Sequence, residues 1–260
     1  MPIITLTTDF GLGSGYVGMM KGVILGIAPD VQIVDLSHDI PAQNVLAAAM
    51  LLARCAPFFP TGAIHLAVVD PGVGGARRPL LVATDSLICV GPDNGLFTAA
   101  LKLPSARAWE LDRARFWLSP LSFTFHGRDL FAPVAARLAC GMKPDELGSP
   151  IDDPTILQMP QAERTRESSI VGHVVEVDRF GNLRTDIPAS WLSEGARWLG
   201  RVAGVPIPGP NRSYDSVAAG ELVMLEGSDH YLEIALRDGN AAAQLGVGIG
   251  EELELELAPA

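Results

Sequence analysis

The sequence predicts an α/β protein in which an N-terminal, mostly parallel sheet flanked by helices is followed by a smaller C-terminal β-barrel. Short β-branched and aliphatic runs alternate with helical patterns in the first half of the chain. These runs are apolar throughout, as in strands that are covered on both faces. Beyond residue 160, short alternating runs are separated by glycine and proline turns, which is typical of a small barrel or sandwich.

The pattern of the first half predicts five strands and three helices. Strands are expected at 3–8, 31–37, 63–70, 79–85 and 87–91, and helices at 16–28, 43–56 and 130–141. Residues 141–169 contain four prolines and many charges without periodicity, which indicates a linker. We therefore expect two domains, residues 1–160 including linker sequence and residues 161–260, which suits a chain of 260 residues.

Composition and charge narrow the classes of protein. With 48% hydrophobic and 19% charged residues, the chain is expected to be globular, and it lacks the run of about 18 apolar residues that spans a membrane. The N-terminal segment has no signal-peptide pattern, so a cytoplasmic location is expected. A net charge of -11 disfavours binding to nucleic acid. The three cysteines lie far apart without a CxxC spacing, which indicates buried thiols and no metal.

The stretch "TTDFGLGSGYVG" at residues 7–18 allows three interpretations. Gly13-x-Gly15-x-x-Gly18 matches a dinucleotide-binding fingerprint, and Asp35 lies about 20 residues on, where a ribose-binding acid belongs. However, Gly13 comes five residues after the expected strand end at Thr8, and Asp9 would face two phosphates. The alternatives are a structural glycine turn, or a site where Asp9 accepts hydrogen bonds from ligand hydroxyls.

A second strand end, in "AVVDPGVGGARRPL", repeats the pattern. Asp70 follows an apolar strand, and a glycine-rich loop then leads to Arg77 and Arg78. One interpretation is a tight loop with a surface ion pair. The other places Asp70 and Arg77 in the same cleft as Asp9, where the permanently charged Arg77 could hold an anion or a water with hydroxide character.

The segment "SFTFHGRDLFAP" places His126 between aromatic residues, just before an expected helix. A structural histidine is one interpretation. A base is the other, if His126 lies beside Asp70 and Arg77. The adjacent Arg128 and Asp129 are expected to form a structural ion pair that caps the helix.

In the C-terminal half, "VEVDRFGNLRTDI" carries Asp178, Phe180 and Asn182. An asparagine amide suits an adenine edge because it offers a donor and an acceptor, and a phenylalanine ring can stack on a base. The structural alternative is a strand, a turn at Gly181 and a second strand.

Six motifs in order carry a family resemblance: "TDFG", "VVDPGVG" with Arg77 seven residues after its aspartate, "GPDNGLF", "TFHGRD", "VDRFGN" and "YLEIA…GNAA". Together they resemble the S-adenosylmethionine hydrolases, also called SAM hydroxide adenosyltransferases, which are relatives of fluorinase and chlorinase. The resemblance covers essentially the whole chain. It implies an α/β domain, a C-terminal barrel and a homotrimer with sites shared between neighbouring subunits.

The resemblance also implies an activity. Asp70, Arg77 and His126 match a set that activates water for attack on the ribose 5′ carbon of S-adenosylmethionine, giving adenosine and methionine without a cofactor or metal. Halogenating relatives lack this set, so its presence favours hydrolysis. The alternatives are an adenosine- or SAM-binding module without turnover, a halogenase-like enzyme, and a nicotinamide-dependent oxidoreductase built on the glycine fingerprint.

Substrate contacts carry over by motif position as expectations. Asp9 and Gln43 are expected at the ribose, Asp178 at the methionine ammonium and Ser228 at the methionine carboxylate. The adenine is expected to meet Phe180, Asn182, Asn240 and Ala241, with Tyr214 as an aromatic wall. One departure is "EGSDHYLEIA", where Asp229 stands in place of the aromatic or basic residue that relatives usually carry.

Overall fold

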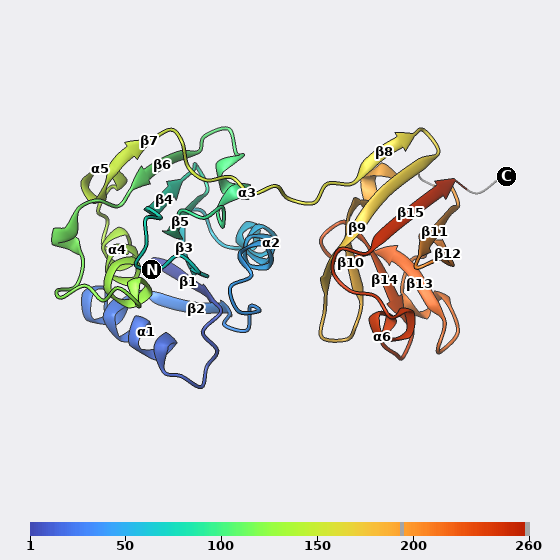
Figure 1. Ribbon diagram of the computed structural model, residues 1–260, viewed down its shortest axis with the longest axis horizontal. Coiled ribbons are helices and arrows are strands. Elements are labelled where there is room, and N and C mark those ends of the chain that lie inside the picture. The colour runs from blue at the N-terminus through green and yellow to red at the C-terminus, as the bar shows by residue number, and fades with distance from the viewer. Residues whose placement is uncertain (193–194, 258–260) are drawn as a thin grey trace. The chain divides into compact units, whose positions relative to one another are not determined.

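In the computed structural model, which describes residues 1–192 and 195–257, the first of two units spans Met1–Gln158. It is built on a seven-stranded sheet with the order β2-β1-β3-β5-β4-β6-β7 (Figure 1). The strands are β1 (Ile3–Thr8), β2 (Gln32–Ser37), β3 (Ala63–Val68), β4 (Pro79–Ala83), β5 (Leu87–Pro92), β6 (Arg107–Glu110) and β7 (Ser149–Ile151). The predicted α/β class is confirmed.

The sheet is mixed in direction. β2, β1, β3 and β5 pair in parallel, whereas β4, β6 and β7 pair antiparallel to their neighbours. β4 and β5 form a hairpin in which the Thr84 amide donates to Leu87 O at 2.9 Å. A parallel crossover needs a dozen or more residues, and this connection is too short to provide one. The parallel part of the sheet is therefore formed by β2, β1, β3 and β5. The candidate site begins at the ends of two of these strands, β1 and β3.

Helices cover both faces of this sheet (Figure 1). On one face, α1 (Tyr16–Ile27) and α4 (Ala132–Ala139) bury Met20 and Ile24 against Ile4 and Leu6. On the other face, α2 (Val45–Cys55) and α3 (Thr98–Leu101) pack over a separate core. That second core includes Ala48, Leu52, Leu80, Val82 and Phe97. Burial on both faces explains why these strands are apolar throughout.

The parallel register positions two acidic residues at one edge of the sheet. β1 and β3 are neighbours, and Thr8 at the end of β1 pairs with Val68 at the end of β3. Asp9 follows Thr8 directly, and Asp70 comes two residues after Val68. Both aspartates therefore lie at the carboxyl edge, where ligands bind in sheets of this kind.

Part of the segment expected to be an irregular linker is regular structure. Residues 141–169 contain α5 (Pro144–Leu147), β7 and β8 (Glu163–Arg166), so the expectation of a linker was wrong for these elements. β7 pairs with β6 at the edge of the sheet, which is a position where a proline such as Pro150 is tolerated. Three- and four-residue elements are too short to produce a periodic pattern in the sequence.

The second unit, Met159–Ala260, is a barrel-like sheet of eight strands. Its order is β12-β11-β15-β9-β10-β14-β13, with β8 paired to β9. After β8 come β9 (Ser169–Val177), β10 (Leu183–Pro188), β11 (Trp198–Val202), β12 (Val205–Gly209), β13 (Leu222–Glu226), β14 (Tyr231–Leu236) and β15 (Glu252–Leu257). The ends of this order approach each other, since Asn211 N after β12 donates to Met224 O of β13 at 2.7 Å. The predicted smaller barrel is confirmed.

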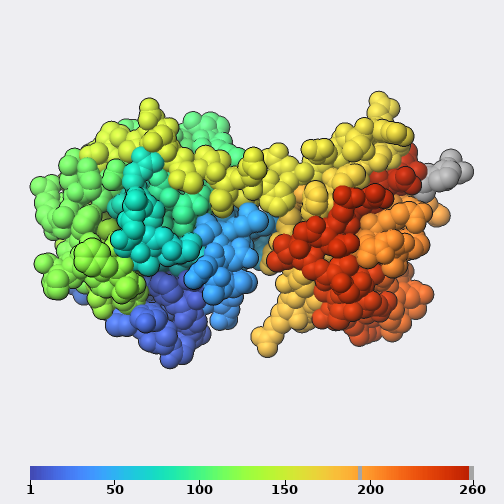
Figure 2. All heavy atoms as spheres, viewed as in Figure 1, coloured from blue at the N-terminus to red at the C-terminus, as the bar shows by residue number. Residues whose placement is uncertain are grey.

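Alternation builds the core of the second unit. Leu253 and Leu255 of β15 are fully buried, whereas Glu252, Glu254 and Glu256 between them are exposed. Figure 2 shows the outer surface around β15 in red, next to the yellow surface of β8 and β9. The short helix α6 (Ala241–Leu245) follows β14 and is capped by Asn240, whose Oδ1 accepts from Ala243 N at 2.7 Å.

The helices of the described part of the chain are all too short or too polar to cross a membrane. Among residues 1–192 and 195–257, no group of three or more histidine, cysteine, aspartate or glutamate side chains is arranged to hold a metal ion.

Candidate active site

Asp70, Arg77 and His126 form one hydrogen-bonded cluster in the first unit. Arg77 Nε lies 3.0 Å from both carboxylate oxygens of Asp70, and Arg77 Nη2 also donates to Asp70 Oδ2. Arg77 Nη2 lies 2.7 Å from His126 Nδ1. The side chains of Asp70 and Arg77 are only 4% and 10% exposed. The structure thus brings the loop that carries Asp70 and Arg77 together with His126, which lies 49 residues after Arg77 in the sequence.

The loop between Asp70 and Arg77 depends on close approaches. Its first turn is closed by Val73 N donating to Asp70 O at 3.2 Å. Gly74 has φ +73, and a Cβ there would lie 2.2 Å from the carbonyl oxygen of Phe123. Because Phe123 is three residues before His126, this contact packs the arginine loop against the histidine segment. Glycine at position 74 therefore serves both the backbone conformation and the approach of the two segments.

Gly74→Ala is expected to destabilise the protein and to lower turnover. The left-handed backbone alone costs about 1 to 3 kcal/mol with a side chain, and the clash with Phe123 adds to that. Gly62→Ala is the matched control, since Gly62 has φ +84 but open space around a Cβ. Urea unfolding and kcat should show a larger loss for Gly74→Ala on both measures. Equal losses in the two variants would contradict the packing role.

Arg78, the neighbour of Arg77, has a structural role. Its Nε donates to Asp93 Oδ2 at 3.0 Å, and its Nη1 to Asp153 Oδ1 at 2.7 Å. Asp93 is nearly fully buried and also accepts from Thr155 N at 2.7 Å. Arg78 therefore fixes the C-terminal end of the loop and leaves Arg77 to the cluster.

His126 immediately precedes a π-helical turn, Gly127–Phe131, which leads into α4. Such turns occur frequently at functional sites. Arg128 and Asp129 form the expected ion pair, with Nε and Oδ1 at 2.6 Å. Asp129 also accepts from Ser122 N at 2.9 Å, so the pair holds the preceding loop rather than capping the helix.

The protonation of His126 follows from its partner. A guanidinium has only donors, so His126 Nδ1 must accept from Arg77 and the ring proton must lie on Nε2. Burial and the positive charge of Arg77 lower the pKa of His126, which keeps the imidazole neutral. Within the described residues, His126 Nε2 and the two N–H groups of Arg77 Nη1 have no protein acceptor. The cluster thus offers donors, which suits an anionic oxygen.

Asp9 lies at the end of β1 and is held by the loop before α2. Its Oδ2 accepts from Gln43 N at 2.8 Å, and Gln43 adopts a left-handed conformation with φ 63. Asp9 Oδ1 has no hydrogen-bond donor among the described residues, so one carboxylate oxygen is available to a ligand. The backbone of Gln43 therefore positions Asp9, whereas the Gln43 side chain is exposed.

A hydrogen-bonded network that starts at Thr8, the residue before Asp9, was not expected from the sequence. Thr8 Oγ1 lies 2.8 Å from His38 Nδ1, and His38 Nε2 lies 3.0 Å from Asp35 Oδ1. Asp35 Oδ2 accepts from Lys21 Nζ at 2.6 Å. Asp35 is therefore engaged by two partners, which argues against a ribose-binding role and the dinucleotide interpretation.

The glycine loop also differs from a dinucleotide fingerprint. The first left-handed residue after β1 is Gly11, with φ 64, and Gly15 precedes α1 with φ 75. Tyr16 at the start of α1 packs edge-on against Phe10 and Phe125, with ring centroids 5.8 and 5.0 Å apart. The loop thus packs against the residue that precedes His126.

In the second unit, two of the predicted adenine-binding residues, Phe180 and Asn182, lie at one turn with Asp178. Asp178 Oδ1 accepts from Phe180 N at 2.8 Å and Asn182 N at 2.9 Å, and Asp178 Oδ2 accepts from Asn182 Nδ2 at 3.1 Å. Gly181 has φ +84, and a Cβ there would lie 2.1 Å from Asn240 side-chain atoms. Phe180 is 75% exposed. The turn and the start of α6 are therefore in contact.

Ala241 and Tyr214 occupy different environments. Ala241 is fully buried at the start of α6, and the neighbouring Ala242 N donates to Gly181 O at 2.9 Å. Tyr214 donates its hydroxyl to Glu233 Oε1 at 2.7 Å. Burial, together with Glu233, raises the pKa of Tyr214 to about 12, so the phenol stays protonated.

Glu233 and Arg184 were not singled out as site residues, although both lie within the quoted motifs. Burial and the charges of Asp178 and Asp229 raise the pKa of Glu233 against the lowering effects of Tyr214 and Arg184. Arg184 Nε donates to Asp229 Oδ2. Ser228, next to Asp229, is exposed. These residues place both signs of charge near the turn at Asp178.

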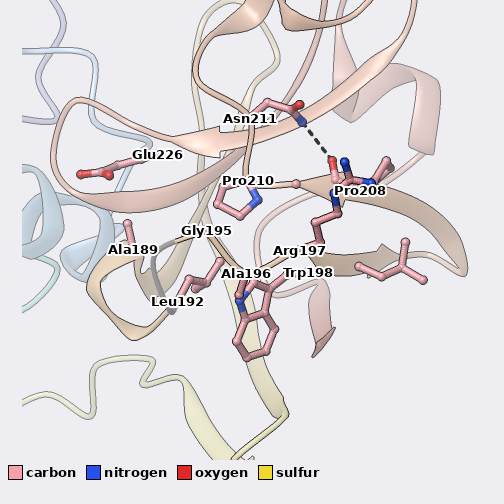
Figure 3. A pocket seen from close by; sticks show the side chains of 12 residues that line it. Ala189, Leu192, Gly195, Ala196, Arg197, Trp198, Pro208, Pro210, Asn211 and Glu226 are labelled. Atoms are coloured by element: carbon pink, nitrogen blue, oxygen red, sulfur yellow. Dashed lines mark hydrogen bonds between the residues drawn. The ribbon is translucent and has the colours of Figure 1, made fainter. Parts of the chain in front are cut away.

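A separate cavity of about 820 Å³ lies in the second unit, between the segment that precedes β11 and the end of β12 (Figure 3). Its lining includes Trp198, Arg197, Pro210 and Glu226. Of the described residues that line it, none is a predicted substrate-binding residue.

Fold and site together define a class: a two-unit α/β and barrel protein with a hydrogen-bonded Asp–Arg–His cluster in its first unit. The chain belongs to the SAM hydroxide adenosyltransferase family. The N-terminal domain model of that family matches residues 4–148, and the C-terminal domain model matches residues 172–254.

The names of similar proteins are consistent with membership of this family. The (R)-S-adenosyl-L-methionine hydrolase of Salinispora tropica is 39% identical, covering 98% of this chain and 97% of that protein. The hydrolase of the same name from Thermus thermophilus is also 39% identical, covering 95% and 97%. A fluorinase from Actinoplanes is more distant, at 27% identity over 72% of each chain.

A solved structure shows the same fold. An uncharacterized conserved protein from Thermotoga maritima superposes with a TM-score of 0.91 at 34% identity, covering 97% of this chain and 99% of that one.

Proposed function

We propose that this protein hydrolyses S-adenosyl-L-methionine to adenosine and L-methionine, by attack of water or hydroxide on the ribose 5′ carbon. The observation that carries the proposal is the Arg77 guanidinium, which is fixed by Asp70 and bonded to a neutral His126. The hydrolases named above, at 39% identity over nearly the whole chain, support the same activity.

The chemistry of the substrate explains why such a cluster suffices. Attack at the 5′ carbon expels methionine as a neutral thioether, so the leaving group needs no acid. The difficult partner is water, a weak nucleophile at neutral pH. Arg77 Nη1 and the Nε2 proton of His126 are donors that stabilise hydroxide, which forms when the bound water loses a proton to bulk solvent. Hydroxide then forms the bond to the 5′ carbon as the carbon–sulfur bond breaks and its electron pair leaves with methionine. Asp70 acts as a positioning residue for Arg77.

The substrate contacts are proposals of the same kind. The free oxygen of Asp9 accepts from the ribose hydroxyls, with Gln43 beside it. Phe180 stacks on the adenine, and Asn182, Asn240 and Ala241 meet its edge. Asp178 receives the methionine ammonium, Ser228 the carboxylate, and Tyr214 supplies an aromatic wall.

We also propose a homotrimer in which neighbouring subunits share each substrate. The proposal rests on the family resemblance, and on ligand-binding residues that fall in both units of the chain, such as Asp9 and Asn182. Light scattering of the purified protein is expected to give three times the mass of the 260-residue chain. A fully active monomer would contradict it.

The activity is tested by incubating the purified protein with S-adenosylmethionine and separating nucleosides by chromatography. Adenosine and methionine in equal amounts are the expected products. Binding without turnover would identify a SAM-binding module instead. Formation of 5′-chloro-5′-deoxyadenosine in chloride buffer, in preference to adenosine, would identify a halogenase-like enzyme.

A further inference from the structure

Arg184 of β10 uses only a small part of its hydrogen-bonding capacity within the chain. Its Nε donates to Asp229 Oδ2, and its guanidinium lies 5.0 Å from the ring centroid of Tyr231. A guanidinium has five N–H donors, so the four on Nη1 and Nη2 are left without an acceptor among the described residues. The side chain is only 15% exposed, so few solvent molecules can serve these donors.

The register of the barrel gives Arg184 its neighbours. β10 is antiparallel to both β14 and β9, and Arg184 is directly opposite Glu233 of β14 and Glu176 of β9. Opposite residues of such a pair lie on the same face of the sheet. The turn before β14 carries Ser228 and Asp229, and it is closed by Gly227 N donating to Tyr231 O at 2.8 Å.

Charges of both signs meet on this face. Glu233 accepts from the Tyr214 hydroxyl, and the charge of Asp178 acts on both residues. Arg184 supplies the positive charge beside Asp229. A surface with several acidic groups and a partly free guanidinium fits a zwitterion, which is the form of an α-amino acid at neutral pH.

We propose that Arg184 binds the α-carboxylate of the substrate's amino-acid part through its free Nη groups, and thereby determines specificity for a substrate that carries this carboxylate. The proposal rests on the proposed hydrolysis of S-adenosylmethionine. It also accounts for Asp229, whose negative charge would repel a carboxylate at Ser228 unless Arg184 neutralised it.

The geometry favours this role over a purely structural ion pair. Arginine commonly meets a carboxylate with two parallel N–H groups. Here the hydrogen bond to Asp229 uses Nε, and both Nη groups have no acceptor among the described residues. Asp229 fixes the orientation of the Arg184 guanidinium. The two Nη groups of that guanidinium can then bind a second carboxylate.

The test compares S-adenosylmethionine with its decarboxylated analogue, which keeps the sulfonium and the amine but lacks the carboxylate. In Arg184→Met, kcat/KM for S-adenosylmethionine is expected to fall about 10- to 100-fold, the loss of one charge-assisted hydrogen-bonded contact. The value for the decarboxylated analogue should stay within about twofold of the wild type. Arg201→Met, an exposed arginine of β11, is the matched control and should change neither value.

An equal loss of kcat/KM with both substrates in Arg184→Met would indicate a structural role and overturn the proposal. No loss with either substrate would also overturn it. So would an Arg184→Lys variant that prefers S-adenosylmethionine over the analogue as strongly as the wild type does. Arg184→Lys keeps the positive charge but not the two parallel N–H groups, so it should lose part of the preference for S-adenosylmethionine. It replaces Arg184→Met as the test if the methionine variant does not fold. A wild type without turnover would instead contradict the proposed hydrolysis, which separates the two failures.

Discussion

Arg77→Ala is expected to lower kcat about 100- to 1,000-fold while leaving the KM for S-adenosylmethionine within about threefold. Arg77 is the only cation that bonds to both Asp70 and His126 among the described residues. In the proposed mechanism its Nη1 donors hold the nucleophile and bind it more strongly in the transition state than in the ground state. Steady-state kinetics with adenosine detection measures both constants.

Asn182→Ala is the matched control for Arg77→Ala because it removes a predicted adenine contact rather than a contact to the nucleophile. It should raise KM and change kcat little. Thermal unfolding must accompany both variants, since Arg77 also lies 5.3 Å from the Phe131 ring centroid. A similar rise in KM for both variants would contradict this division of roles.

His126→Gln is expected to retain more activity than His126→Ala, by about tenfold. In the structure His126 Nδ1 accepts from Arg77, so Nε2 carries the proton and donates. A glutamine amide can also donate at that distance from the backbone, whereas alanine cannot. If His126 acted as a base through Nε2, both variants would be equally inactive, and kcat measurements at one pH distinguish the two cases.

The pH dependence follows from the same tautomer. Protonation of Nδ1 would break the bond to Arg77, so activity requires neutral His126. Burial and Arg77 lower the pKa of His126 below its ordinary value of 6.5. Neutral imidazole therefore persists as the pH falls through 6.5, and the acid limb of the kcat/KM profile should lie below that value. An acid limb above pH 6.5 that disappears in His126→Gln would contradict this.

Much of the site in the first unit could be predicted because its residues follow strand ends. Strand 3–8 was predicted with the bounds observed for β1, and the parallel register then places Asp9 and Asp70 at one edge. The sequence predicted Arg77 as the partner of Asp70, but it gave no role to Arg78 at the end of the same loop. The fold supplies that role, because Asp93 and Asp153 hold Arg78 from segments 15 and 75 residues away.

The contacts that were missed join segments far apart in the chain. Arg184 meets Asp229 across the register of β10 and β14, which local patterns do not fix. His38 joins Thr8 to Asp35 in the same way, through side chains on neighbouring parallel strands and the loop that follows. In both cases the partners lie in different segments of the chain, so periodicity within one segment gives no sign of the pairing.

The central claim is that water attacks the ribose 5′ carbon directly. The competing route is attack by the Asp70 carboxylate, which would form an ester with the 5′ carbon and release methionine. Water would then cleave that ester at its carbonyl carbon and leave a protein oxygen on the nucleoside. Both Asp70 oxygens accept from Arg77, which weakens this carboxylate as a nucleophile.

A single turnover in oxygen-18 water, with enzyme in excess over S-adenosylmethionine, separates the two routes by mass spectrometry. The account predicts one oxygen-18 atom in the 5′ hydroxyl of adenosine and no label in methionine. Adenosine without the label would contradict direct attack by water and assign the nucleophile to the protein.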